Sequence, residues 1–191
     1  SSSSDGLKLV SCTFRKSFIM ESRTLGNIIA DSLQLSVGYA ERLLRNVPKD
    51  DAACFARAGE RIIESNHPAF IYGHLSLYAP KVLWQLAAPV PTIPEYFETL
   101  FSKDATCREE ADLYPDFDDI TAFFFEGHRM LAGALRSTSD DTFDKPNPAE
   151  GKMAERFPTL GSVHTFYCGA HIMMHLGQMS VWRRMMDLGR A

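Results

Sequence analysis

The chain has 191 residues, a length that fits one domain with a sizeable buried core. Hydrophobic residues make up 45% of the chain and charged residues 23%, which are ordinary globular values, and the formal net charge of −4 gives no reason to expect a nucleic-acid partner. No apolar run approaches the roughly 20 residues that cross a bilayer, so we expect no membrane partner.

The start of the chain is expected to lie apart from the folded domain. Residues 1–19 are interpreted as an N-terminal extension, partly disordered, because their opening Ser-Ser-Ser-Ser-Asp-Gly lacks the apolar core of a signal peptide. Residues 20–191 are expected to form a single domain. The cysteines are scattered without paired spacing, which is typical of reduced thiols in a cytoplasmic protein: Cys12, Cys54, Cys107 and Cys168.

Two helices are predicted in the first half of the chain. Apolar residues recur at helical spacing from about residue 20 to residue 47. A second helix is expected over 66–88, with Asn66 as a good N-cap, and Pro80 should kink this helix or end it early. Between the two helices, residues 52–63 can hold a short helix.

Two further helices are predicted in the second half. One begins with Asp118 or Asp119 as its N-cap and runs to about residue 136, and the last covers about 161–188 with Ser162 as its N-cap. No segment alternates with period two for long enough to predict a strand. Four long helices joined by long crossover connections predict an all-α fold, a four-helix bundle.

The most informative residues are histidines of the second and last predicted helices. His171 and His175 lie four residues apart, a spacing that projects both side chains from one helical face, and two neutral imidazoles so placed can bind one transition-metal ion. His74, deep in the second helix, is the candidate third ligand, and the neighbouring Gly73 indicates close packing because glycine is costly within a helix. His67, at the start of the same helix, can simply be exposed.

Several segments together resemble the DinB-like (DinB/YfiT) superfamily. They are, in chain order, Gly73-His74-Leu75, Phe157-Pro158-Thr159-Leu160-Gly161, His171-x-x-x-His175-x-Gly177-Gln178, and Arg183-Arg184 followed by Gly189. The resemblance covers the chain from about residue 20 to residue 190. It implies an up-up-down-down four-helix bundle, frequent homodimers, and a divalent metal held by three histidines, which by position are His74, His171 and His175. It also implies kinship with transferases and isomerases that use low-molecular-weight thiols, beside many members of unknown activity.

Three histidine ligands with an open fourth position are typical of a catalytic metal site. An open position can lower the pKa of a bound water or take a thiol as its thiolate, so a low-molecular-weight thiol is a candidate cofactor. Imidazole ligands favour zinc or nickel, with iron, manganese or copper as alternatives. The residues expected to line the pocket or to hold the ligands in place are His164, Gln178, Tyr39 and Tyr78.

Two other interpretations of the histidines stay open. His171 and His175 can be hydrogen-bonded core histidines without a metal. Alternatively, the site can be a closed structural one in which Cys168, His164 or His128 provides the fourth ligand.

The sequence favours a metal-dependent enzyme that acts on a small-molecule substrate. The last helix carries no acidic residue between Ser162 and Val181, so no general base stands out, and this slightly favours thiol transfer over hydrolysis. The alternative is a non-enzymatic metal-binding or interaction bundle. A homodimer is expected from the apolar breadth of Phe123–Phe125 and from the methionines near the C-terminus.

Overall fold

The computed structural model describes residues 23–191, and the expected extension 1–19 with Cys12 lies outside the described residues. The described chain is mostly helical. Its α-helices are α1 (Leu25–Leu44), α2 (Pro68–Ser76), α3 (Tyr78–Gln85), α4 (Phe97–Phe101), α5 (Phe117–Ser137), α6 (Asp140–Phe143), α7 (Lys152–Arg156), α8 (Leu160–Thr165) and α9 (Ile172–Met185). Tighter or wider turns form η1 (Lys49–Asp51), η2 (Ala111–Leu113) and the π-helix η3 (Phe166–His171). None of the helices in this part of the chain is long and apolar enough to cross a membrane.

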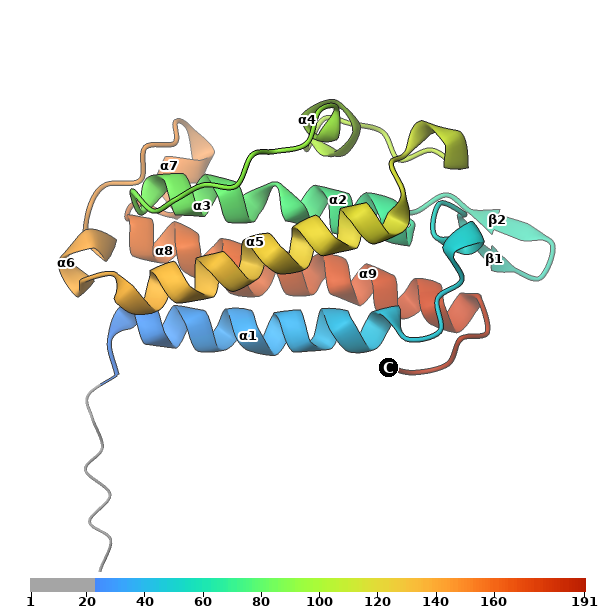
Figure 1. Ribbon diagram of the computed structural model, residues 1–191, viewed down its shortest axis with the longest axis horizontal. Helices are drawn as coiled ribbons and strands as arrows, with labels where there is room; N and C mark the ends of the chain where they lie inside the picture. Colours follow the sequence, from blue (N-terminus) through green and yellow to red (C-terminus); the bar gives the residue numbers. More distant parts are fainter. Residues whose placement is uncertain (1–22) are drawn as a thin grey trace, which may run out of the picture.

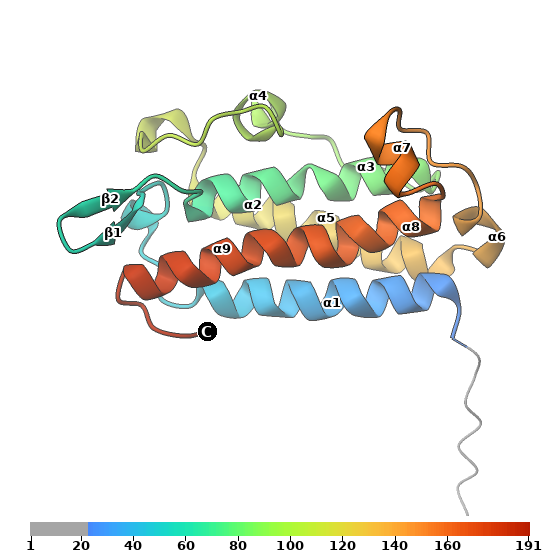
Figure 2. The same ribbon diagram turned by 180° about the vertical axis from the view of Figure 1, so that it is seen from behind.

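The long elements lie side by side with their axes roughly aligned (Figure 1, Figure 2). Both α1 and α2 pack against α5 and α9. Followed along the chain, α1 and the α8–α9 line run in one direction, whereas α2–α3 and α5 run in the other (Figure 1). The expected up-up-down-down order is therefore wrong, because the observed order is up, down, down, up. The reason lies in the connections: 45–67 and 138–159 each stay at one end, and only 86–116 travels along the helices.

The core is apolar and contains large side chains from α1, α2, α5 and α9. Leu33, Tyr72, Phe124 and Trp182 are all fully buried. The two that carry polar atoms satisfy them, since the Tyr72 hydroxyl donates to the Ala40 carbonyl at 2.7 Å and the Trp182 indole N–H donates to a backbone carbonyl at 2.9 Å. Buried aromatic residues with a polar handle need such a partner, so both rings fix the packing of neighbouring elements.

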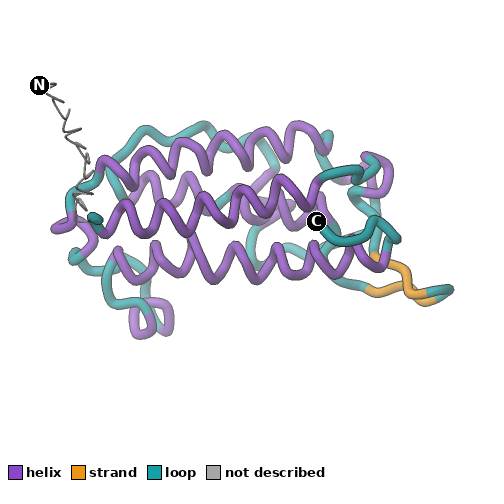
Figure 3. The backbone as a smooth tube through the Cα atoms, turned by 90° about the horizontal axis from the view of Figure 1, so that it is seen from below, coloured by secondary structure: helices purple, strands orange, loops and turns teal. Residues whose placement is uncertain are grey.

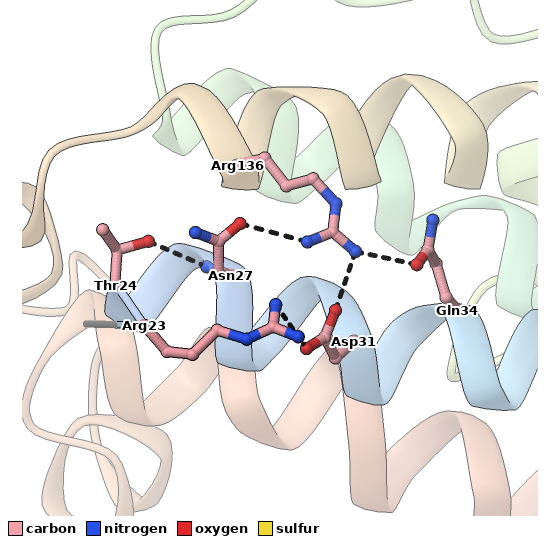
Figure 4. A network of polar contacts seen from close by, with 6 residues as sticks. All are labelled: Arg23, Thr24, Asn27, Asp31, Gln34 and Arg136. Atoms are coloured by element: carbon pink, nitrogen blue, oxygen red, sulfur yellow. Dashed lines mark hydrogen bonds and ion pairs between the residues drawn. The ribbon is translucent and has the colours of Figure 1, made fainter. Parts of the chain in front are cut away.

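A polar network joins α1 to α5 at the edge of this core (Figure 4). The Arg136 guanidinium donates to side-chain oxygens of three residues spaced along α1, namely Asn27 at 3.0 Å, Asp31 at 2.8 Å and Gln34 at 2.7 Å. These residues share one face of α1 because they are three or four positions apart. The Arg136 hydrogen bond lowers the pKa of the Asp31 carboxyl.

The second predicted helix is divided into α2 and α3 at Leu77. The interruption expected from Pro80 is confirmed, and its cause is that proline has no N–H to donate to the carbonyl four residues earlier. The N-cap differs from the prediction: His67 takes this position instead of Asn66, and its Nδ1 accepts the Phe70 N–H at 3.2 Å.

Two other helices begin earlier than predicted. Asp116 caps α5 by accepting the Asp118 N–H at 2.8 Å. Thr159 caps α8, and it forms a reciprocal capping box with Ser162, the residue predicted to be the cap. In both helices a residue predicted as the cap lies inside the first turn. Its backbone N–H donates to the side chain of the actual cap, which precedes it in the chain.

The prediction of a short helix over 52–63 is wrong, and so is the prediction that the chain has no strand. Strands β1 (Ala56–Ala58) and β2 (Arg61–Ile63) form an antiparallel hairpin, which projects beyond the helix ends (Figure 3). Gly59 in its turn has a φ of 63°, a conformation that glycine adopts without steric cost. Strands of three residues are too short to show a period-two pattern, which is why the sequence does not reveal them.

Candidate metal centre

Three histidines, one each from α2, η3 and α9, converge where α2 faces the helix that continues from η3 into α9. His74 lies in the last turn of α2, His171 ends the π-helix and His175 follows one turn later. One ring nitrogen from each lies within 4.8 Å of the other two. The three residues are 6–9% exposed, so the cluster lies at the edge of the core and stays within reach of solvent. The structure thus brings together the three residues that were predicted as ligands.

Hydrogen bonds fix the tautomer of two of these rings. His74 Nδ1 lies 2.8 Å from the Phe101 carbonyl oxygen, and His175 Nδ1 lies 3.1 Å from Gln178 Oε1. Both partners are oxygens that only accept, so both Nδ1 atoms carry the proton and both Nε2 atoms keep a lone pair. Asn66 donates to the same Gln178 oxygen at 3.1 Å and holds the amide in place. A ligand imidazole oriented by its second nitrogen is the usual arrangement in metal sites.

The electrostatics keep the three rings neutral, which is the form that binds a metal. Burial lowers the pKa of His171 to about 3, and His175, His74 and Lys81 add to the lowering. Burial also lowers the pKa values of His74 and His175. His171 Nδ1 is buried without a hydrogen-bond partner among the described residues. A cation held by three lone pairs fits this donor set, because the cluster contains only neutral imidazole nitrogens.

No fourth histidine, cysteine or acidic residue of residues 23–191 joins this cluster. Cys168 is buried in the core, where burial raises the pKa of its thiol to about 12. His128 is buried within α5, and its Nδ1 donates to the Phe124 carbonyl at 2.7 Å. His164 bonds Gln85 through Nε2 at 2.9 Å. The three residues considered as a fourth ligand therefore lie outside the cluster of His74, His171 and His175.

Of the other predicted site residues, Tyr78 and Gln178 contact the triad and Tyr39 does not. The Tyr78 ring lies 4.3 Å from the His171 ring and 5.2 Å from the His74 ring, centroid to centroid, and burial raises the pKa of its hydroxyl to about 12. Gln178 orients His175 as described. Within the described chain, Tyr39 makes no hydrogen bond or aromatic contact with the triad. The Arg42 guanidinium instead lies over its ring, with Cζ 5.5 Å from the ring centre.

His67 is not the exposed residue that its position at a helix start suggested. It is fully buried, its Nδ1 accepts from the backbone, and its Nε2 donates to the Arg108 carbonyl at 2.9 Å. Both nitrogens are therefore occupied, and the ring serves as a buried N-cap.

Sequence reasoning missed two contributors to the site. The Phe101 carbonyl orients His74 from α4, and Lys81 donates to the Tyr167 hydroxyl at 3.0 Å beside the triad. A backbone carbonyl from a helix distant in the sequence has no sequence signature. Lys81 does have a sequence signature, because it follows His74 by seven residues and Tyr78 by three. Residues at this spacing lie on one face of a helix.

Comparison with known proteins finds no matching family model and no matching curated protein. The site is therefore described by its own geometry: three neutral imidazoles, two of them held by hydrogen bonds at Nδ1, that could hold a metal ion.

Proposed function

We propose that the protein is a metal-dependent enzyme of the DinB-like superfamily that binds one divalent transition-metal ion through His74, His171 and His175. The observation that carries the proposal is the convergence of three ligand nitrogens within 4.8 Å, with the Nδ1 atoms of two rings engaged elsewhere. Zinc or nickel suits three imidazoles best among the divalent ions.

The proposed activity is thiol transfer to a small molecule. A divalent ion in a site of three neutral ligands supplies its full charge to an anionic fourth ligand, and a thiolate meets that preference. The chain's residues would do the rest: Phe101 and Gln178 hold two ligand rings in orientation, and Tyr78 covers one side of His171. No acidic side chain lies in α2, α3, α8, η3 or α9, so the elements that hold the triad offer no carboxylate as a general base.

Cobalt substitution tests this proposal, because thiolate binding to cobalt adds a charge-transfer band to the spectrum. Titration with small thiols should produce the band in the wild type and not in His74→Ala. If no thiol perturbs the spectrum while a group at the site titrates near neutral pH, hydrolysis replaces thiol transfer as the proposed reaction. If neither change occurs, the protein is better described as a metal-binding or interaction bundle.

A further inference from the structure

A row of polar side chains continues from the triad along the contact between α3 and η3. We call Tyr78, Lys81 and Tyr167 the polar seam. The Tyr78 and Tyr167 rings lie 5.0 Å apart, and Lys81 Nζ donates to the Tyr167 hydroxyl at 3.0 Å. The same ammonium lies 4.9 Å from the centre of the Tyr167 ring and 6.0 Å from that of Tyr78. The seam is therefore one connected group and not three separate surface residues.

The seam and the triad share the same two helical faces. Tyr78 and Lys81 follow His74 by four and seven residues, and Tyr167 precedes His171 by four. Because Tyr78 lies 4.3 Å from the His171 ring and 6.0 Å from Lys81 Nζ, one phenol ring separates the ammonium from a ligand histidine. Seven residues of helix correspond to roughly 10 Å. A small molecule can therefore contact both places at once.

The charge of this region is positive and uncompensated. Lys81 is exposed, and no ion pair within residues 23–191 joins it to a carboxylate. The elements that form the seam and the triad contain no aspartate or glutamate. A divalent ion held by neutral histidines would add to this positive potential, so an anion is the ligand group that the region favours.

We propose that Lys81 and the Tyr167 hydroxyl bind the carboxylate of a small-molecule ligand whose other end would bind the metal as its fourth ligand. The inference rests on the proposed function, since it needs a metal at the triad. The Tyr167 hydroxyl accepts from Lys81 and keeps its own hydrogen to donate, so the pair offers an ammonium and an O–H to one anion. A single cation suits a carboxylate better than a phosphate dianion, for which several cations or a helix N-terminus are usual.

The test compares two probes that differ in one end. Mercaptohexanoate and mercaptohexanol share a thiol and a chain of the same length, but only the first carries a carboxylate. Each is titrated into the cobalt-loaded protein, and binding is followed by the thiolate–cobalt band. The wild type should bind the carboxylate probe about tenfold more tightly, as expected for charge-assisted hydrogen bonds at a partly exposed site.

Variants of Lys81 identify the source of that preference. Lys81→Met should remove it, Lys81→Arg should retain most of it, and Lys145→Met, which changes an exposed lysine of the α6–α7 connection, should leave it intact. All should take up cobalt as the wild type does. Equal binding of the two probes by the wild type, or an unchanged preference in Lys81→Met, would overturn the inference while leaving the proposed metal site standing. A wild type that takes up no cobalt would contradict the proposed function, and this inference with it.

Discussion

At the scale of single residues, Gln178 is the side chain through which the site can be tested with the least disturbance. It is an exposed residue whose oxygen accepts the His175 Nδ1–H at 3.1 Å. Gln178→Ala removes the group that orients this ring, so the metal affinity should fall about 10–100-fold, the usual cost of losing such a partner. Competition with a chromophoric chelator measures the change.

Gln85→Ala is the matched control for that substitution. Gln85 makes the corresponding hydrogen bond to His164, a histidine outside the triad, at 2.9 Å. Its loss should leave the metal affinity as in the wild type. The same drop in both variants would mean that the amide of Gln178 has no special relation to the ligands.

The triad itself could be predicted from the sequence, and the reason is its spacing. His171 and His175 are one helical turn apart, so their proximity follows from local geometry alone. His74 could be named only as a candidate, because contact between two helices depends on how they pack. The orientation of His74 by Phe101 could not be predicted at all, since a main-chain oxygen looks the same in every residue.

At the scale of elements, the close packing expected at Gly73 is confirmed and links α2 to α4. A Cβ built on Gly73 would lie 2.5 Å from the Phe101 ring, which is fully buried. Gly73→Ala should therefore lower the free energy of unfolding by about 2 kcal/mol, as overpacking of a core does. It should also weaken metal binding, because the displaced residue is the one whose carbonyl holds His74.

Gly133→Ala provides the comparison within a long helix. Gly133 is an exposed residue of α5, and no heavy atom lies within 4 Å of the position its Cβ would take. This variant should gain roughly 0.5–1 kcal/mol because alanine loses less conformational entropy than glycine in a helix. Urea unfolding of both variants checks the pair, and a Gly73→Ala protein as stable as the wild type would show that the α2–α4 contact can relax freely.

The last helix shows which part of an element the sequence does not reveal. Its extent was predicted, but the π-helix over Phe166–His171 was not, because no residue pattern requires it. The wider turn shifts the face of the residues that follow it, and Met174, three residues after His171, is 56% exposed. Such bulges occur often at functional sites, and this one ends at a ligand histidine.

At the scale of the whole molecule, buried histidines make stability depend on pH. Burial lowers the pKa of His128 to about 4, whereas the unfolded chain has an ordinary value near 6.5. Above pH 6.5 both states are neutral; below it the unfolded state gains the proton first, so stability falls as the pH drops from 6.5 toward 4. This difference between the folded and unfolded pKa values corresponds to a loss of about 3 kcal/mol in the free energy of unfolding over the full pH window.

Unfolding in urea between pH 7 and pH 5 measures this dependence. His128→Gln removes the titrating group and keeps a side chain that can donate a hydrogen bond. The variant should lose less stability than the wild type over the interval. Parallel curves for the two proteins would contradict the assignment of acid sensitivity to His128.

The expected homodimer stays a prediction, and the structure changes its basis. Phe124 is fully buried and its neighbours Phe123 and Phe125 pack against the core, so they do not offer a free apolar face. Leu35 and Met173, 70% and 40% exposed, line a groove between α1 and η3. Sedimentation should give twice the 21.4 kDa chain mass, with Leu35→Glu shifted toward the monomer.

Ile62→Glu is the control for the dimer, because Ile62 is also an exposed apolar residue, at 50%, but belongs to the hairpin. It should leave the dimer intact. A wild-type monomer at tens of micromolar would remove the prediction altogether.

The central claim is that three histidines hold one metal ion, and elemental analysis of the purified protein tests it most directly. The wild type and His164→Asn, which changes a buried histidine outside the triad, should each carry about one divalent ion per chain. His74→Ala, His171→Ala and His175→Ala should carry almost none while keeping the helical circular dichroism of the wild type. Equal metal content in the wild type and the triad variants would contradict the account.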